Sequence, residues 1–466
     1  MKRCGTNPMR GQRCLFLTRT ILVCGNSARV FGVFCALSVL LFYGGCAASS
    51  GAKIITIWTD QSVVALYAGY FNAAQDAARN PYKAEVFYFD NVGERLAETR
   101  PDEKDGPDIV IGNWLNSAET ISLFRPIKPF YQTNVPLESV FYAGLLEDGW
   151  LKGDQVLLPV SFDAQVIAFD RNNAALLPNP FSMSLSELQE TGATYNRMRN
   201  DVWTQVGFSP LWNEEFLFLS TALLGADWRE AVPQADQAAG SVVWPAAGLV
   251  AWDEAKLKAA LETLREWVVV ANDSIQADDD FSFKYFFASP DKLATSDRIL
   301  FTVMRVSDFF KLAEERRDAL DFRWLEHEGR IVPAEDIVYY GVYRKSGAKA
   351  KAVAFTNWFF SEESQDAMLA KGRAARTTET FFGIAGGFSA MRGVTETAFM
   401  RYYTGMLGHV PPGEKIVSPG VFPSFFPELK ERVIIPYLKE QIRLTNSNGT
   451  NGDTLESRLS NWTRME

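Results

Sequence analysis

The sequence predicts an α/β fold. Short β-branched and apolar segments alternate with segments whose apolar residues recur at helical spacing, and the links between them are short. Hydrophobic residues make up 47% of the chain, which is enough apolar mass for a full core and excludes a disordered or collagen-like protein. By length alone, 466 residues allow about three domains, or one or two large ones.

The first predicted elements follow one another as strand, helix, strand, helix and strand. They are Lys53–Thr59, Val63–Arg79, Ala84–Asp90, Gly93–Thr99 and Asp108–Gly112. Ser62 can cap the first helix, and Asn80-Pro81 ends it. This order with short links is typical of a parallel sheet.

Later segments continue the alternation. Gln155–Phe169 is a long apolar extended stretch interrupted by Pro159. Asp253 is the predicted N-cap of a helix, with Trp252 and Leu257 placed as a hydrophobic staple. The remaining predicted elements are strands at Arg298–Val306 and Asp336–Tyr343, a helix at Ala348–Phe360, and a helix from the cap Ser361 to Gly372.

The first 45 residues are predicted to be a targeting segment. They contain six Lys and Arg residues, no acidic residue, and the 14-residue apolar run Val30–Tyr43. A membrane span needs about 20 such residues, so the run fits the core of a signal peptide better. The small residues that lead into Cys46 resemble a bacterial lipoprotein signal, although Tyr43 stands where Leu is usual. The resemblance implies removal of residues 1–45, lipidation of Cys46 and a tether at 46–52. Plain secretion and an uncleaved anchor helix are the alternatives.

Charge and cysteine content exclude several classes of protein. After the first 45 residues, 41 basic and 56 acidic residues remain, a net charge of −15. Such a body would repel a phosphate backbone, so we expect no nucleic-acid partner. All five cysteines lie at or before Cys46, which leaves none for a disulfide or a thiolate metal site in the rest of the chain.

Catalytic motifs are missing from the sequence. The chain has two histidines and no HExxH, GxSxG, P-loop or GxGxxG pattern, so we expect no cofactor, no metal and no enzymatic activity. A glycosidase needs only two carboxylates, which Glu214-Glu215 or Asp278–Asp280 could supply. A glycosidase and a surface adhesin or other lipoprotein that does not transport are therefore the alternatives to a binding protein.

Six segments occur in an order that resembles one family. They are ITIWT at 54–58, DGPDIVIGNW at 105–114, LPVSFDAQVIAFDRNNAAL at 158–176, SPLWNEEFLFLSTALLGADW at 209–228, DRILFTVMRVSDFF at 297–310 and DIVYYGVYRKSGAKAKAVAFTNWFFSEESQ at 336–365. Their succession resembles the extracellular solute-binding proteins of sugar ABC importers, the group that includes maltose-binding protein. The resemblance covers roughly 54–365, with a weaker match at Gly386–Arg392.

This resemblance implies a periplasmic-binding-protein-like fold of two lobes, with a hinge and an interlobe cleft. The first lobe would comprise residues 53–160 plus 336–388, and the second 161–335 plus 389–466. The hinge would lie near Val160–Phe169, Val332–Val338 and Gly386–Ala390.

The chemistry of sugars and the resemblance together select the site residues. A sugar ring has an apolar face that packs on aromatic rings and a rim of hydroxyls that bind carboxylates, amides and guanidinium groups. Ligands of open α/β sheets lie at the carboxyl ends of the strands. The predicted ligand-binding residues, at strand ends and at positions that match family contact regions, are Trp58, Asp60, Asn113, Trp114, Asp163, Trp212, Arg305, Asp308 and Tyr340.

The sequence thus predicts a monomeric, lipid-anchored substrate-binding protein of an ABC importer. It would capture a sugar or related polyol on the periplasmic or cell-surface side of a bacterial membrane. Its partners would be this small-molecule ligand, the permease subunits, and the membrane that holds its anchor.

Overall fold

The computed structural model describes residues 53–99, 106–231, 234–235, 242–243, 249–347, 349–377, 380–444 and 453–463, with the backbone alone at 234–235, 242–243 and 463. These residues belong to one compact unit, Lys53–Glu466. The predicted signal segment, Cys46 and the tether at 46–52 lie outside the described residues, as do residues 445–452 of the polar tail. Among the helices of the described part, none is both long and apolar enough to span a membrane.

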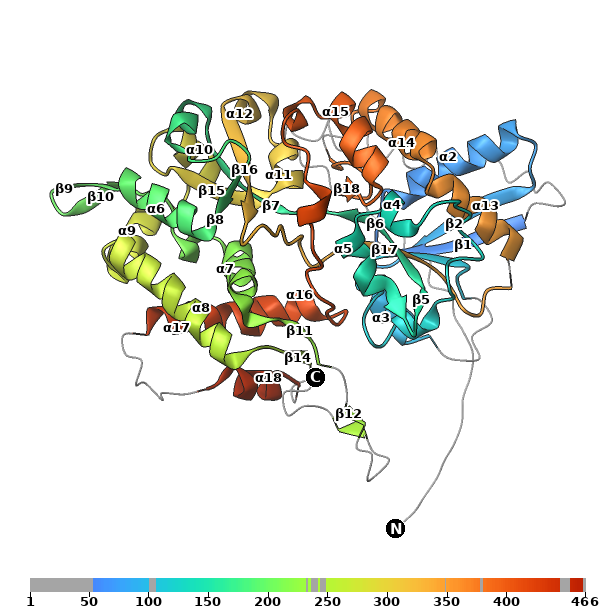
Figure 1. Cartoon of the computed structure of the whole chain (residues 1–466), viewed down its shortest axis with the longest axis horizontal. Coiled ribbons are helices and arrows are strands. Elements are labelled where there is room, and N and C mark those ends of the chain that lie inside the picture. Colours follow the sequence, from blue (N-terminus) through green and yellow to red (C-terminus); the bar gives the residue numbers. More distant parts are fainter. Residues whose placement is uncertain are drawn as a thin grey trace, which may run out of the picture. The chain divides into compact units, whose positions relative to one another are not determined.

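A six-stranded mixed sheet forms the first of two sheets (Figure 1). Its strands, in spatial order, are β18 (Phe388–Ser389), β6 (Leu157–Phe162), β17 (Val338–Val342), β3 (Ile109–Gly112), β1 (Lys53–Thr59) and β2 (Tyr82–Tyr88). The pairs β1–β2 and β1–β3 are parallel, as predicted. The strands β17, β6 and β18 join antiparallel, so the prediction of a parallel sheet holds only for β1, β2 and β3.

Several helices lie beside this six-stranded sheet (Figure 1). They are α2 (Val64–Ala77), α3 (Val92–Ala97), α13 (Lys349–Phe359) and α14 (Glu362–Ala374), with the short α4 (Leu137–Val140), α5 (Ala143–Leu146) and α15 (Phe399–Tyr402). The predicted cap of α14 is confirmed, because the Ser361 hydroxyl accepts the Ser364 N–H. The predicted cap of α2 is wrong. Ser62 makes no side-chain cap there, because backbone carbonyls such as that of Gln61 already accept the first N–H groups.

The second sheet has four strands. They are β15 (Phe301–Arg305), β7 (Gln165–Asp170), β16 (Leu320–Glu326) and β8 (Ser182–Ser184), in that order across the sheet. Only β8 pairs parallel to its neighbour. The extended stretch predicted at Gln155–Phe169 is therefore not one strand, because β6 belongs to the first sheet and β7 to the second. We call the parts built on the six-stranded and four-stranded sheets lobe 1 and lobe 2.

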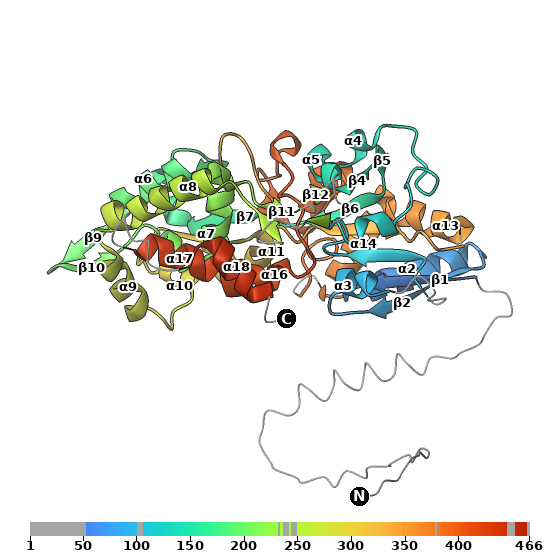
Figure 2. The same cartoon turned by 90° about the horizontal axis from the view of Figure 1, so that it is seen from below.

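Most helices of lobe 2 come from the middle and the end of the chain (Figures 1 and 2). They are α6 (Leu185–Tyr195), α7 (Glu214–Thr221), α8 (Glu254–Glu266), α9 (Ile275–Lys284), α10 (Pro290–Thr295), α11 (Val306–Lys311), α12 (Glu314–Asp318), α16 (Phe426–Leu429), α17 (Ile435–Arg443) and α18 (Leu455–Thr463). The predicted Asp253 cap is confirmed, since its carboxylate accepts the Lys256 N–H at 3.0 Å.

Short strands pair as hairpins or ribbons beside the two sheets. They are β4 (Trp150–Leu151) with β5 (Asp154–Gln155), β9 (Arg197–Arg199) with β10 (Val202–Gln205), β11 (Arg229–Glu230) with β14 (Val250–Ala251), and β12 (Gln234–Ala235) with β13 (Val242–Val243).

The core follows the two-residue repeat of the strands. Along β7, Val166 and Ala168 pack into one hydrophobic cluster, whereas Ile167 and Phe169 pack into another on the opposite face. The first cluster continues into the six-stranded sheet. Rings connect the two lobes there, because Trp324 of β16 lies 5.9 Å from Phe388 of β18 between ring centroids.

The chain passes between the two sheets through short links. Asp163 and Ala164 join β6 to β7, and residues 327–337 lead from β16 back to β17. The links contact each other, because Ala164 and Pro333 form an antiparallel bridge. Ile331 of the second link pairs in turn with Ile416, which belongs to a later segment that leads to α16. Gly386–Ala390, expected as a hinge return, contributes β18 to the six-stranded sheet.

Two glycines give a stability test of this packing. A Cβ on Gly207 would lie within 2.2–2.5 Å of backbone atoms of Gly192 in α6, whereas a Cβ on Gly69 in α2 would meet nothing within 4 Å. We expect Gly207→Ala to lower the free energy of unfolding by about 1–3 kcal/mol or more, because backbone must move. Gly69→Ala should raise it by about 0.5–1 kcal/mol through helix propensity. Denaturant titration measures both, and equal stability of the two variants would contradict the packing of α6.

Candidate functional site

Two adjacent cavities lie where the strands and links of the two lobes meet. Cavity A has a volume of about 390 Å³, and its lining residues are Asn113, Trp114, Glu214, Glu215, Arg305, Glu335, Asp336, Phe426, Pro427, Lys430 and Glu431. Cavity B has a volume of about 290 Å³, and its lining residues are Gln61, Asn113, Ser161, Phe162, Asp163, Arg305, Ser307, Asp308, Lys311, Asp336, Val338, Ala385, Gly386 and Gly387. Both sets draw on both lobes.

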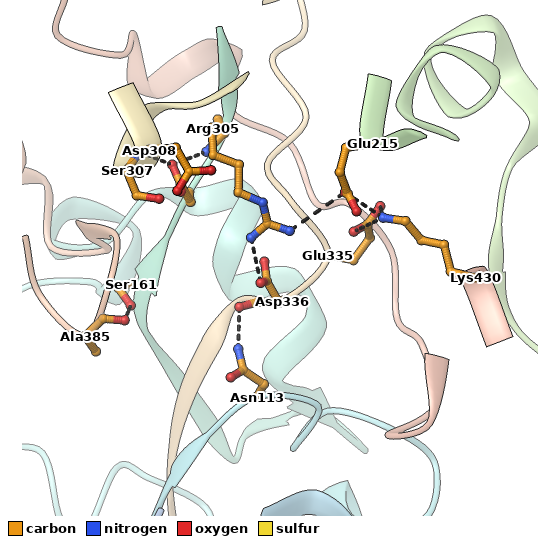
Figure 3. A network of polar contacts seen from close by, with 12 residues as sticks. Asn113, Ser161, Glu215, Arg305, Ser307, Asp308, Glu335, Asp336, Ala385 and Lys430 are labelled. Carbon is orange, nitrogen blue, oxygen red and sulfur yellow. Dashed lines mark hydrogen bonds and ion pairs between the residues drawn. The ribbon is translucent and has the colours of Figure 1, made fainter. Parts of the chain in front are cut away.

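Asn113, Arg305 and Asp336 line both cavities and mark the boundary between them (Figure 3). Asn113 directly follows β3, and Arg305 ends β15. Arg305 Nη1 lies 2.7 Å from Asp336 Oδ2, and the Asn113 side-chain amide donates to the Asp336 carbonyl. Asn113 of lobe 1 and Arg305 of lobe 2 therefore both bind the link that precedes β17.

A second cation completes this polar network. Lys430 Nζ, which is almost fully buried, lies 2.7 Å from Glu215 Oε2 and 3.0 Å from Glu335 Oε2. Glu215 also lies 3.8 Å from Arg305 Nη2 and so connects the two cations (Figure 3). Burial alone would lower the pKa of Lys430, but the carboxylates of Glu335 and Glu215 outweigh it and raise the pKa.

Carboxylates exceed cations around the two cavities. The acids are Glu214, Glu215, Glu335, Asp336, Glu431, Asp163 and Asp308, and the cations are Arg305, Lys430 and Lys311. Burial would lower the pKa of Arg305, but Asp336 and Asp163 raise it, so the guanidinium stays charged. The site therefore presents many hydrogen-bond acceptors and a few fixed charged donors.

Asp163 holds the first link between the lobes. Its Oδ1 accepts the backbone N–H groups of Ala164 at 2.8 Å and Ser307 at 3.3 Å, and its carbonyl accepts the Ala334 N–H. Burial raises the pKa of the Asp163 carboxyl to about 6, even though hydrogen bonding by Ser307 and the charge of Arg305 lower it. The carboxyl thus fixes the link and also lines cavity B.

Five of the nine predicted site residues line the cavities. Asn113 and Arg305 line both, Trp114 lines cavity A, and Asp163 and Asp308 line cavity B. Trp114 has a left-handed backbone (φ 60°) and lies 6.2 Å from Phe426 of α16 between ring centroids. Its ring therefore extends from the end of β3 in lobe 1 to the core of lobe 2.

Asp60 lies directly behind the cavity wall. Its Oδ1 accepts the Gln61 side-chain amide at 2.8 Å, and its Oδ2 accepts the Asn113 N–H at 3.1 Å. Burial raises the pKa of Asp60 to about 6. Asp60 therefore positions Gln61 and Asn113, which themselves line cavity B.

The other three predicted residues do not line either cavity. Trp58 is buried between Phe89, at 4.9 Å between ring centroids, and the Arg95 guanidinium. Trp212 stacks on Phe281 at 5.4 Å between ring centroids. The fully buried Tyr340 shares a 2.5 Å hydrogen bond between its hydroxyl and that of Thr356. All three pack within the lobes.

Sequence reasoning missed Glu335, Asp336 and Lys430 as site residues. Glu335 and Asp336 form an acidic pair at the start of the predicted strand Asp336–Tyr343, and this pair was the available signal. Lys430 offers no local signal, because its partners lie about 95 and 215 positions away in the sequence. Among the described residues, no group of three His, Cys, Asp or Glu side chains could hold a metal ion.

The raised pKa of Asp163 predicts a pH effect on stability. A carboxyl whose pKa rises from 3.8 in the unfolded chain to about 6 in the folded one stabilises the fold fully below about pH 4 and loses that contribution as the pH rises through 6. The stability of the wild type relative to Asp163→Asn should therefore fall by about 2 kcal/mol between pH 4 and pH 7. Chemical denaturation across this range measures the difference, and a constant difference would contradict the burial of the carboxyl.

Comparisons with known proteins give matches in structure only. No family model matches the chain, and no curated protein matches it in sequence. A sugar transporter protein from Rhizobium etli in an open conformation matches with a TM-score of 0.58 at 13% identity, covering 89% of this chain and 98% of that one.

Two further solved structures give similar matches. The cyclic α-maltosyl-1,6-maltose binding protein of Arthrobacter globiformis has a TM-score of 0.55 at 13% identity, covering 88% of this chain and 99% of its own. A cyclo/maltodextrin-binding protein complexed with maltotetraose has a TM-score of 0.54 at 14% identity, covering 90% and 97%. The predicted resemblance is thus confirmed at the level of the fold: this chain shares the two-lobe α/β fold of these sugar-binding and sugar transporter proteins.

Proposed function

We propose that the protein is a lipid-anchored substrate-binding protein of an ABC importer. It captures a sugar or related polyol between its lobes and delivers it to a membrane permease on the outer side of the membrane. It acts as a monomer and catalyses no reaction on its ligand. The observation that carries this proposal is the pair of cavities lined by both lobes of a fold that sugar-binding proteins share.

The side chains of the cavities match the chemistry of a sugar. Trp114 and Phe426 give cavity A aromatic surface for the apolar face of a ring, and the carboxylates accept hydrogen bonds from hydroxyl groups. Arg305 and Asn113 add donors at the boundary of the two cavities. A hydroxyl both donates and accepts, so this mixture can satisfy several hydroxyls of one ligand.

The surplus of carboxylates restricts the charge of the ligand. Arg305 and Lys430 pair with Asp336, Glu215 and Glu335. Lys311, the third cation of the lining, pairs with Asp308. An anionic sugar would meet net negative charge, whereas a neutral or amino sugar would not. We therefore expect neutral and amino sugars to bind and uronic acids or sugar phosphates to be rejected.

A ligand screen followed by a product assay tests the function. The protein is titrated by thermal shift with neutral, amino and acidic mono- and oligosaccharides, and the sugars that bind are recovered and analysed for chemical change. A rise in melting temperature with an unchanged sugar supports capture. A changed sugar would indicate a glycosidase, and no rise with any sugar would favour an adhesin.

Trp114 and Trp58 form a matched pair of variants. If Trp114 contacts the sugar, Trp114→Ala should weaken binding by roughly 1–3 kcal/mol. Both rings pack in a core, so either change to Ala should lower the free energy of unfolding, by about 3–5 kcal/mol for Trp58. Only Trp114→Ala should also weaken binding, because Trp58 lines neither cavity. Calorimetric binding and melting temperature, measured for both, separate the two roles. Unchanged affinity in Trp114→Ala would remove cavity A from the binding site.

The lipid anchor is tested at Cys46. Labelled fatty acid should enter the wild-type chain in cells, and Cys46→Ser should abolish the label, because the thioether that carries the lipid needs the cysteine sulfur. Cys35→Ser is the matched control and should leave the labelling unchanged. Equal labelling of Cys46→Ser and the wild type would show that Cys46 is not the anchor.

A further inference from the structure

Exposed apolar side chains gather on lobe 2, away from the two cavities. Phe283 at the end of α9, and Phe286 and Phe287 in the turn that follows, are 84%, 75% and 98% exposed. Met198 of β9 and Val202 of β10 are also exposed. The hairpin that carries Met198 and Val202 packs, through β10, against α9, the helix that leads to the three rings (Figures 1 and 2). We call these five residues the lobe-end surface.

The core does not need these phenylalanines. Phe281, two residues before Phe283, is buried and stacks on Trp212, and Tyr285 packs against Phe281 at 4.9 Å between ring centroids. The segment FSFKYFF therefore fixes itself to lobe 2 through Phe281 and Tyr285. Its remaining rings stay in solvent, where Phe286 and Phe287 contact mainly each other, at 5.2 Å. Clustered exposed aromatic rings of this kind mark an interaction surface.

The charges beside these rings are mainly positive. Arg197, Arg199 and Lys284 are exposed within the segments 196–203 and 281–289, against one acid, Asp201. Beyond these segments, Asp279 and Asp280 lie on α9, where Asp279 pairs with Arg443 and Asp280 accepts from Gln276. A local positive excess stands out in a chain whose residues after position 45 carry a net charge of −15.

Apolar rings flanked by Arg and Lys are the combination that binds an anionic bilayer. The rings enter the boundary between headgroups and acyl chains, and the cations attract anionic headgroups. A second copy of this chain would offer the same positive charge and would be repelled at that surface. An acidic partner is favoured, and among acidic partners the membrane is the one that the N-terminal segment brings close.

The length of the N-terminal segment supports this occupant. The apolar run Val30–Tyr43 and Cys46 are its means of membrane attachment, whether the run stays or a lipid replaces it. Cys46 is seven residues from Lys53, so under the proposed anchoring the start of β1 in lobe 1 stays within about 25 Å of the bilayer. Such tethering gives an effective concentration in the millimolar range, at which even a small apolar surface binds.

We propose that the lobe-end surface docks on the lipid bilayer, with Phe283, Phe286 and Phe287 entering the interface and Arg197, Arg199 and Lys284 contacting anionic headgroups. The attached protein then has two points of contact with the membrane, its N-terminal segment and the lobe-end surface. This contact does not depend on what the cavities bind, so it stands or falls separately from the proposed capture of sugar.

Quenching by lipids tests the contact. Full chain purified from membranes is reconstituted into vesicles of phosphatidylcholine and phosphatidylglycerol at less than one chain per vesicle. A fluorophore is attached to Phe287→Cys, and unsubstituted chain labelled in parallel corrects for the native cysteines. The matched control is Leu407→Cys, an exposed apolar residue on another segment. Nitroxide-labelled lipid should quench the label at position 287 at least about twofold more than the label at 407.

The other outcomes contradict the proposal. Equal quenching at the two positions means that the surface has no preference for lipid. Quenching that requires several chains per vesicle means that a second copy covers the surface.

In the variant Arg197→Gln/Arg199→Gln, labelled at 287, the quenching should fall in anionic vesicles. It should also lose its sensitivity to salt, because salt screens the attraction between the arginines and the headgroups. Unchanged quenching in that variant would exclude the headgroup contact.

Discussion

Two cations of lobe 2 hold two consecutive carboxylates of the link between the lobes, and the geometry of the site depends on them. Arg305 pairs with Asp336 and Lys430 with Glu335, while Glu215 contacts both cations. The Lys430–Glu335 pair is buried, so removing one partner would leave an uncompensated buried charge, which is far more costly than never having the pair. The link before β17 is therefore fixed in position, and with it Asn113, whose amide donates to the Asp336 carbonyl.

The ring contacts between the lobes limit how they can move. Phe310 of α11 stacks on Phe382 at 5.3 Å between ring centroids, and Trp324 of β16 lies close to Phe388 of β18. Aromatic rings of lobe 2 therefore pack against aromatic rings of lobe 1 near β18. A rigid-body rotation keeps contacts near its axis and changes those far from it. An axis through the links at Asp163 and the ring contacts would preserve this packing. Cavity A, which Trp114 and Phe426 line from opposite lobes, would then change most.

Sequence alone could predict strand ends but not which way their side chains face. The parallel strands β1 and β3 were recognisable from β-branched composition, and Asn113 and Trp114 follow from the end of β3. Trp58 lies near an equally clear strand end, yet its ring turns into the core beside Phe89. Tyr340 sits in the middle of β17, where both faces of the sheet are covered. A position two residues from a strand end can face either way, and only packing decides it.

Contacts distant in sequence account for what could not be predicted. Lys430 becomes a site residue because α16 places it beside Glu215 and Glu335, which no local pattern encodes. The antiparallel addition of β17, β6 and β18 likewise depends on where the chain returns after lobe 2, because only a long connection leaves both strand directions open. The hydrophobic repeat records burial, whereas strand direction is set by the connections.

If the cavities bind the ligand as proposed, the same ionic network that fixes the link also restricts the chemistry of that ligand. A buried cation requires carboxylates around it, and Asp336, Glu335 and Glu215 pair with Arg305 and Lys430 in this way. The acids with no cation in direct contact, such as Asp163, then face the cavities as acceptors. Once water leaves a closed site, each acceptor needs a donor from the ligand. Hydroxyl and ammonium groups supply such donors, whereas a carboxylate or phosphate supplies none. Under the proposed function, the network that fixes the link between the lobes therefore also favours ligands rich in hydroxyls or amines.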